Sequence, residues 1–212
     1  MADIPLLIDG PKKAPWTCLL VPPSGYNMRI EFMAHFAKML GEAGLRVVRF
    51  DYPHMVERNH TGKRRPPDKE PVLCDYVMQV IRQIGAEKLF IGGKSTGARV
   101  AAQVADNAGV QAVACLGFPF HATSKPGEYE SAPLDRIVTP TILIQGELDT
   151  FGDKEEVSGY SLSPNLQIKW IREGDHSLQP PKESKRTREE NWNAAAKLVA
   201  RFFMEVAGVE LG

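Results

Sequence analysis

The sequence predicts an α/β protein with a mostly parallel, twisted sheet of about seven strands flanked by helices. Two observations predict this class. Short apolar runs alternate with amphipathic segments along the chain, and most of the runs are nearly continuous in Val, Ile and Leu. Strands that are covered on both faces need apolar side chains on both sides, as in parallel sheets whose crossover helices lie above and below them. We therefore expect a three-layer architecture in a single domain over residues 1–212.

Seven apolar runs predict the strands. They lie at residues 4–8, 17–21, 46–51, 88–92, 111–117, 140–145 and 166–171. Two segments between them have the 3.6-residue apolar period of helices, with their apolar positions at Ile30, Met33, Phe36, Ala37 and Leu40 and at Leu73, Tyr76, Val77, Val80, Ile81 and Ile84. Gly85 predicts the end of the second helix, and the Thr187–Glu190 spacing predicts a capping box at the start of a last helix. Residues 53–71 and 121–139 are expected to form loops.

Composition excludes several classes of protein. The chain has 26 basic and 26 acidic residues, so a globally basic nucleic-acid binder is not expected. No apolar stretch approaches the length needed to cross a bilayer, and the N-terminus lacks the features of a signal peptide. Cys18, Cys74 and Cys115 lie far apart in apolar segments, which predicts buried thiols and a cytoplasmic protein. No His, Cys or carboxylate spacing indicates a metal, and no cofactor is expected.

The segment Gly93-Lys94-Ser95-Thr96-Gly97 matches the G-x-S-x-G pattern of a nucleophile elbow. Such an elbow is a sharp strand-to-helix turn that exposes a serine hydroxyl, and it requires glycines where side chains would collide with neighbouring elements. The context fits, because an apolar run precedes the motif and a helix of small residues follows it. The alternative, a phosphate-binding P-loop, requires glycine where this chain has Lys88.

A serine nucleophile needs a base and an acid, which in this type of site follow it in the order Ser, Asp or Glu, His. His176 follows the last apolar run, where a loop at the carboxyl edge of the sheet would place it beside Ser95. Asp149 follows a strand and a glycine turn, and is the favoured acid. Glu147 is the strongest alternative, and Asp153 and Asp175 are the others; an exposed loop histidine remains the alternative for His176.

An oxyanion hole is expected from backbone N–H groups near the nucleophile. Thr96 follows Ser95 directly, and the loop after residue 21 offers Ser24 and then Gly25, since Pro22 and Pro23 have no N–H. The same loop could instead be only a rigid turn.

Together these motifs resemble the α/β-hydrolase superfamily. The resemblance is greatest to its small capless branch, similar to dienelactone hydrolases, which includes testis-expressed hydrolase-like proteins and the hydrolase-like subunit of a histone-acetyltransferase complex. It extends from about Leu6 to Phe203 and includes the Gly92–Ser95, Gln145–Asp149 and Gly174–His176 segments. It implies a catalytic triad of Ser95, Asp149 and His176. Relatives usually have His-Gly where this chain has Pro22-Pro23.

Only residues 121–139 separate two strands between which larger hydrolases insert a lid, so no cap domain is expected. The open site would be walled by Tyr26, Met28, Phe118 and Phe120, although the two phenylalanines could be ordinary core residues. The predicted function is hydrolysis of a small carboxylic ester or thioester through an acyl-enzyme, on a small-molecule substrate and without nucleic acid or membrane. The alternative is a non-catalytic interaction module, and the protein could be a homodimer or a complex subunit. The basic loop 62–70 could bind an anionic partner or simply be solvated.

Overall fold

The computed structural model describes residues 3–125, 129 and 133–209. Seven strands form one sheet in the order β1-β3-β2-β4-β5-β6-β7. Only β1 (Leu6–Asp9) is antiparallel, and it pairs with β3 (Arg46–Phe50) at one edge. The parallel strands are β2 (Thr17–Val21), β3, β4 (Leu89–Lys94), β5 (Ala112–Leu116), β6 (Thr141–Gly146) and β7 (Leu166–Ile171). The predicted sheet is therefore confirmed.

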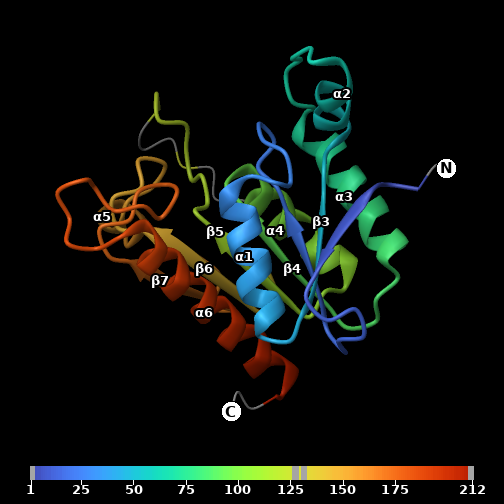
Figure 1. Cartoon of the computed structure of the whole chain (residues 1–212). Coiled ribbons are helices and arrows are strands. Elements are labelled where there is room, and N and C mark those ends of the chain that lie inside the picture. Colours follow the sequence, from blue (N-terminus) through green and yellow to red (C-terminus); the bar gives the residue numbers. More distant parts are fainter. Residues whose placement is uncertain (1–2, 126–128, 130–132, 210–212) are drawn as a thin grey trace.

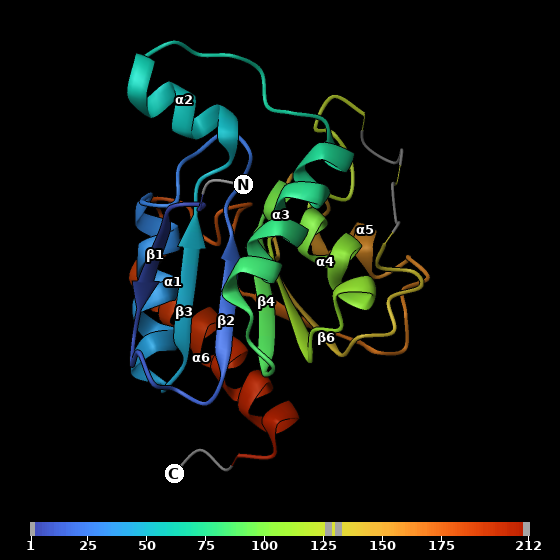
Figure 2. The same cartoon turned by 90° about the vertical axis from the view of Figure 1, so that its right-hand side faces the viewer.

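Helices cover both faces of the sheet, as Figures 1 and 2 show. On one face, α1 (Glu31–Glu42) packs against α6 (Arg188–Ala207); on the other, α3 (Glu70–Ile84) packs against α4 (Thr96–Ala108). The apolar stripes of α1 and α3 lie in these two cores, because residues three and four apart share one face of a helix. The layers are those that the sequence predicts.

One stack of aromatic rings shows how the α6 side of the core is filled. The Phe90 ring of β4 lies between Trp16 and Phe203, with centroid distances of 4.5 Å to each. The segment before β2 and the last helix, α6, thus pack on the central strand of the sheet. The capping box is also confirmed, because Thr187 accepts from the Glu190 N–H and Glu190 accepts from the Thr187 N–H. Gly85 ends α3 with φ of 59°.

The prediction of a loop over residues 53–71 is wrong in part. Residues 53–61 form α2 (Pro53–Thr61), which projects beyond the carboxyl edge of the sheet (Figure 2). Proline is common in loops, but Pro53 fits the first turn of this helix, where its missing N–H costs no hydrogen bond. In the basic segment that follows, Arg65 pairs with Glu57 and Asp68 at 2.8 and 2.9 Å.

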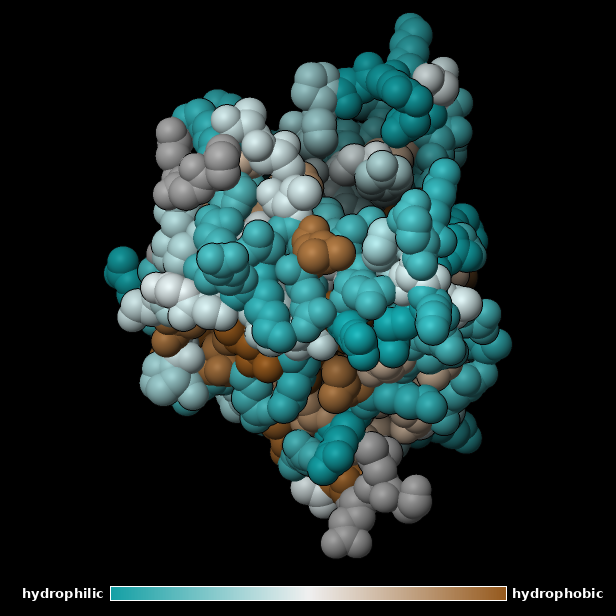
Figure 3. Space-filling model, turned by 90° about the vertical axis from the view of Figure 1, so that its left-hand side faces the viewer, coloured by the Kyte–Doolittle hydropathy of each residue, from teal (hydrophilic) through white to brown (hydrophobic). Residues whose placement is uncertain are grey.

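The described residues between β5 and β6 contain no helix or strand, in agreement with the expected loop. Residues 126–128 and 130–132 of this loop lie outside the described residues. The only element between β6 and β7 is the short α5 (Lys154–Val157). Within the described ranges, none of the helices has the length and apolarity needed to span a membrane. The face in Figure 3 is mostly hydrophilic, with small hydrophobic areas.

Candidate active site

The chain passes from β4 to α4 through a single residue, Ser95. Its φ of 56° and ψ of −124° lie outside the regions that L-residues favour, which is a local strain typical of functional sites. The glycines on either side allow this turn. A Cβ on Gly93 would lie 2.2 Å from the Gly97 carbonyl oxygen, and a Cβ on Gly97 would lie 2.4 Å from that of Val21. The expected collisions are therefore confirmed.

The structure brings Ser95, His176 and Asp149 together from the ends of three strands. Ser95 Oγ lies 2.8 Å from His176 Nε2. His176 Nδ1 lies 3.0 and 2.9 Å from the two carboxylate oxygens of Asp149. This is the serine, base and acid arrangement that nucleophilic catalysis requires.

Asp149 is held in place by contacts that the sequence did not predict. Its side chain is buried and accepts from Gln145 Nε2 at 2.9 Å and from the Phe151 N–H at 2.9 Å. The Phe151 ring lies 4.3 Å from the His176 ring, centroid to centroid. Gln145 could have been found as the one polar side chain near the end of an apolar strand.

The three alternative acids have other partners. Glu147 binds Lys154 at 2.8 Å and the Glu173 N–H at 3.1 Å, and these contacts hold the pKa of its carboxyl below the usual range. Asp153 caps α5, while Asp175 accepts from the N–H groups of its own loop. Of the four carboxylates, only Asp149 contacts His176.

Lys94 is a further residue at the site, which the sequence motifs did not predict. Its side chain is buried, and its Nζ donates to the His176 carbonyl oxygen at 2.6 Å. Burial lowers the pKa of its ammonium group to about 8, although the charges of Asp149 and Asp175 act in the opposite direction. A lysine within an apolar strand was the available signal.

The predicted oxyanion loop is arranged differently from the expectation. The Ser24 N–H donates to Thr96 Oγ1 at 2.8 Å, so it is not free to bind an oxyanion at Ser95. The Ser24 carbonyl lies 2.5 Å from Nε2 of the buried His54. Gly25 lines a separate hollow beside α2. The bonded N–H therefore contradicts Ser24 as a donor, whereas Gly25 and Thr96 stay predictions. Thr96 lies in the first turn of α4, where backbone N–H groups have no intrahelical acceptor.

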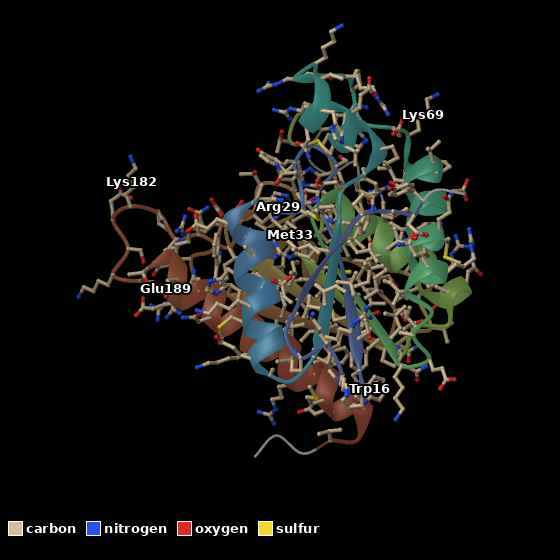
Figure 4. The ribbon with its side chains drawn as sticks, turned by 45° about the vertical axis from the view of Figure 1, so that its right-hand side comes forward. Trp16, Arg29, Met33, Lys69, Lys182 and Glu189 are labelled. Carbon is tan, nitrogen blue, oxygen red and sulfur yellow. The ribbon has the colours of Figure 1, made fainter. Side chains whose placement is uncertain are left out.

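A pocket of about 350 Å³ opens at Ser95, between the N-terminal ends of α1 and α6. Figure 4 shows Arg29 at this end of α1 and Glu189 in the first turn of α6. Lys182, in the loop before α6, extends away from the molecule (Figure 4). The pocket is lined by Pro23, Tyr26, Ile30, Glu31, Phe32, Lys94, Ser95, His176, Ser177, Gln179, Arg188 and Trp192.

Aromatic side chains and one ion pair line this pocket. Arg188 binds Glu31 through two hydrogen bonds, one of them 2.8 Å long, and lies over the Trp192 ring at 4.7 Å from its centroid. Trp192 Nε1 donates to the Ser177 carbonyl at 2.8 Å, which ties α6 to the loop of His176. The pocket therefore combines aromatic and charged walls, with Ser95 and His176 among its polar lining residues.

Of the four predicted pocket residues, only Tyr26 lines the pocket. Met28 is buried, with its N–H bound to Asp51 at 2.6 Å and its carbonyl bound to Arg49 at 2.7 Å. Phe118 and Phe120 are also buried and belong to the core on the α3 and α4 face, opposite to the pocket. Gln145 fixes this position, because its side chain binds both the N–H and the carbonyl of Phe118 at 2.8 and 3.1 Å.

The other groups considered for chemistry are metal ligands and the three cysteines. Within the described residues, no group of three or more His, Cys, Asp or Glu side chains could hold a metal ion. All three cysteines are free; Cys18 and Cys115 are buried as expected, and Cys74 is partly exposed. Burial raises the pKa of the Cys74 thiol to about 11 and those of the other two further, which disfavours a thiolate nucleophile.

Comparisons with known proteins place this fold in a family. The family described as alpha/beta hydrolase domain matches residues 16–204, so the chain belongs to that family. Its structure is similar to that of an alpha-beta serine hydrolase homologue from Coxiella burnetii, with a TM-score of 0.70 at 21% identity over 92% of this chain and 89% of the other. It is also similar to a serine hydrolase without lid from Xanthomonas campestris (TM-score 0.68, 21% identity, 93% and 88%) and to dienelactone hydrolase from Anabaena variabilis (0.70, 21%, 94% and 90%).

Proposed function

We propose that this hydrolase cleaves a small carboxylic ester or thioester through an acyl-enzyme on Ser95. The observation that carries the proposal is the 2.8 Å contact between Ser95 Oγ and His176 Nε2, with the Asp149 carboxylate behind the ring. His176 takes the Ser95 proton while Oγ attacks the acyl carbon, and then returns it to the leaving alcohol or thiol. Water, activated by the same imidazole, attacks the acyl-enzyme and releases the acid and Ser95.

The environment of the oxyanion favours activated substrates. Thr96 supplies a backbone N–H at the positive end of α4, but Pro23 has none and that of Ser24 is bound to Thr96 Oγ1. One oxyanion donor is worth about 10²- to 10³-fold in kcat. We therefore expect aryl esters and thioesters, which have good leaving groups, to react faster than alkyl esters.

The pocket favours a small substrate with an apolar group. A volume of about 350 Å³ lies near the lower end of ligand pockets in general. Its aromatic walls suit an aryl or short alkyl group better than a long acyl chain.

We also propose that the protein is cytoplasmic, on the basis of its three unpaired cysteines.

Active-site labelling tests the proposal. A fluorophosphonate probe is expected to label the folded wild-type protein and displace fluoride, with the adduct on Ser95 by peptide mass spectrometry. The labelled protein is expected to lose its ability to hydrolyse 4-nitrophenyl acetate. A folded protein that is not labelled, or is labelled at another residue without loss of hydrolysis, would contradict the proposal.

Tyr26 provides a test of the substrate pocket. Its side chain is 61% exposed, so its truncation leaves the core unchanged. We expect Tyr26→Ala to raise KM for 4-nitrophenyl benzoate by about 3- to 10-fold, since an aromatic pair contributes about 0.5–1.5 kcal/mol. KM for the acetate should change less. The control is Tyr26→Phe, which keeps the ring and should retain the wild-type KM; equal effects on both esters would argue against a contact with the aryl group.

The second candidate function is a non-catalytic interaction module, within a homodimer or as a complex subunit. The specific observation that favours it is the lack of free backbone donors at Pro23 and Ser24. A closer relationship to the testis-expressed hydrolase-like proteins would agree with either function. The module predicts that a partner is recovered and that the wild-type protein neither reacts with the fluorophosphonate nor hydrolyses esters.

A further inference from the structure

The Lys94 ammonium group is buried beside the histidine of the candidate triad. Its side chain is 5% exposed, and its Nζ donates to the His176 carbonyl oxygen at 2.6 Å. The same Nζ lies 5.6 Å from the centroid of the Phe32 ring. Among the described residues, no carboxylate forms an ion pair with it within 4.0 Å. A buried cation therefore has a carbonyl and an aromatic ring as its partners.

This arrangement costs stability. Removal of an ammonium group from water is unfavourable unless a counter-charge contacts it, and burial accordingly lowers the pKa of Lys94 to about 8. A methionine of similar length would fill the same space without this cost. The stability of the fold therefore does not explain why a lysine is buried at this position.

Gly117 shows how closely Lys94 approaches the catalytic groups. This glycine has φ of 60°. A Cβ built on it would lie 2.6 Å from the His176 carbonyl oxygen, 2.9 Å from Lys94 Nζ and 3.6 Å from His176 Nδ1. The ammonium, the carbonyl and the ring nitrogen that faces Asp149 thus gather over the same glycine. Lys94 is also the residue before Ser95, so its side chain joins the strand of the nucleophile to the loop of the base.

We propose that Lys94 is a positioning residue that holds the backbone of His176, so that its imidazole stays between Ser95 and Asp149. The inference rests on the proposed hydrolase function of the same site. A charge-assisted hydrogen bond is roughly twice as strong as a neutral one. The hydrogen bond from Lys94 fixes the carbonyl of His176 itself. Other contacts hold neighbouring residues of the loop, such as the hydrogen bond from Trp192 to the Ser177 carbonyl.

The proposal has a pH dependence. The charged or titratable groups around Lys94 are Asp175 and His176 in its own contact loop, Asp149 after β6, Glu31 on α1 and Arg188 on α6. As the pH rises through about 8, the ammonium becomes an amine, which donates a weaker hydrogen bond, and kcat is expected to fall. The free energy of unfolding, by contrast, should rise with pH over the next pH range. Between about pH 8 and the ordinary value of 10.5, the unfolded chain binds more protons at Lys94 than the folded one, so stability gains a rising contribution.

Lys94→Met tests the proposal, with hydrolysis of 4-nitrophenyl acetate and thermal unfolding measured from pH 6 to 10. We expect kcat at pH 7 to fall by about 10- to 100-fold, as for a small misplacement of a catalytic group. KM should be nearly unchanged, and Tm should equal or exceed that of the wild type. The fall of kcat near pH 8 and the contribution to Tm above it should disappear. Lys94→Arg, which keeps the charge, should recover part of kcat without the fall near pH 8.

A spectroscopic measurement separates this proposal from the proposed function. The proton between His176 Nδ1 and Asp149 should give a downfield proton NMR signal in the wild type, which broadens in Lys94→Met. Lys38→Met is the control, since Lys38 is exposed on α1 and should change neither kcat nor the signal. Wild-type kcat and signal in Lys94→Met would overturn the positioning role, as would a parallel loss of kcat and Tm. A wild type that does not react with the fluorophosphonate, but whose signal depends on Lys94, would overturn only the hydrolase function.

Discussion

Replacement of Ser95 by alanine is expected to lower kcat by about 10⁶-fold, the loss seen when the nucleophile of a serine triad is removed. The reason is that Ser95 Oγ is the only atom of the candidate triad in reach to attack an acyl carbon, and it lies 2.8 Å from its base. Steady-state hydrolysis of 4-nitrophenyl acetate and fluorophosphonate labelling measure the effect. Both should disappear together.

The fold should survive this substitution. Ser95 gives no side-chain cap to α4, and alanine has the same Cβ at the same strained φ of 56°. Ser95→Gly should be equally inactive and at least as stable as Ser95→Ala, because glycine relieves a strain of about 1–3 kcal/mol at the cost of some chain entropy. Ser158→Ala is the matched control, since that exposed hydroxyl donates to the Lys154 carbonyl and is not part of the candidate triad. Labelling that persists in Ser95→Ala would identify another nucleophile.

The parts of the fold that follow from period and spacing could be predicted from the sequence. The strands and the α1, α3 and α6 helices have strong apolar patterns, and tertiary packing uses those same faces. The helix α2 has a weaker signal. Its buried residues are His54 and Met55, so the polar and charged composition of the segment resembles that of a loop.

The candidate site divides in a similar way. Ser95, Asp149 and His176 were predictable because parallel strands bring their carboxyl ends to one edge of the sheet, where each residue lies just after a strand. The residues that line the pocket were not predictable, because they depend on the face of the sheet on which each side chain lies. Phe118 lies on the α3 and α4 face, and its backbone is held by two hydrogen bonds to the side-chain amide of Gln145. The spacing of residues in the sequence does not predict these hydrogen bonds. The pocket forms instead from α1 and α6, as Phe32 and Trp192 show.

Backbone donors are the hardest feature to assign from a sequence. The prediction for Ser24 depended only on its place after two prolines. Its N–H is bound by Thr96 Oγ1, a side-chain contact between residues 72 positions apart. His54 then fixes the other side of Ser24 from α2, whose presence was not predicted. The wrong assignment of Ser24 thus follows in part from the missed helix, because contacts from α2 and α4 together hold this loop.

The second large effect is expected from Gly97→Ala. The new Cβ would lie 2.4 Å from the Val21 carbonyl oxygen, 2.6 Å from that of Pro22 and 2.9 Å from the Pro22 carbonyl carbon. All three are backbone atoms at or directly after the end of β2, so rotation of a side chain cannot relieve the collision. Either α4 or the loop after β2 must move. We expect the free energy of unfolding to fall by about 3 kcal/mol or more, at the upper end of overpacking effects, in urea titrations.

Gly109→Ala separates collision from backbone strain. Gly109 has φ of 65° at the end of α4, but open space surrounds the position of its Cβ. Alanine there should cost about 1–2 kcal/mol, the penalty of a left-handed residue, and should leave fluorophosphonate labelling at the wild-type rate. Gly97→Ala should slow labelling as well, because the Ser95 turn and the Pro23 wall of the pocket both adjoin the displaced atoms. A Gly97→Ala variant as stable and as reactive as Gly109→Ala would show that the close approach of Gly97 to the Val21 and Pro22 backbone does not constrain the elbow.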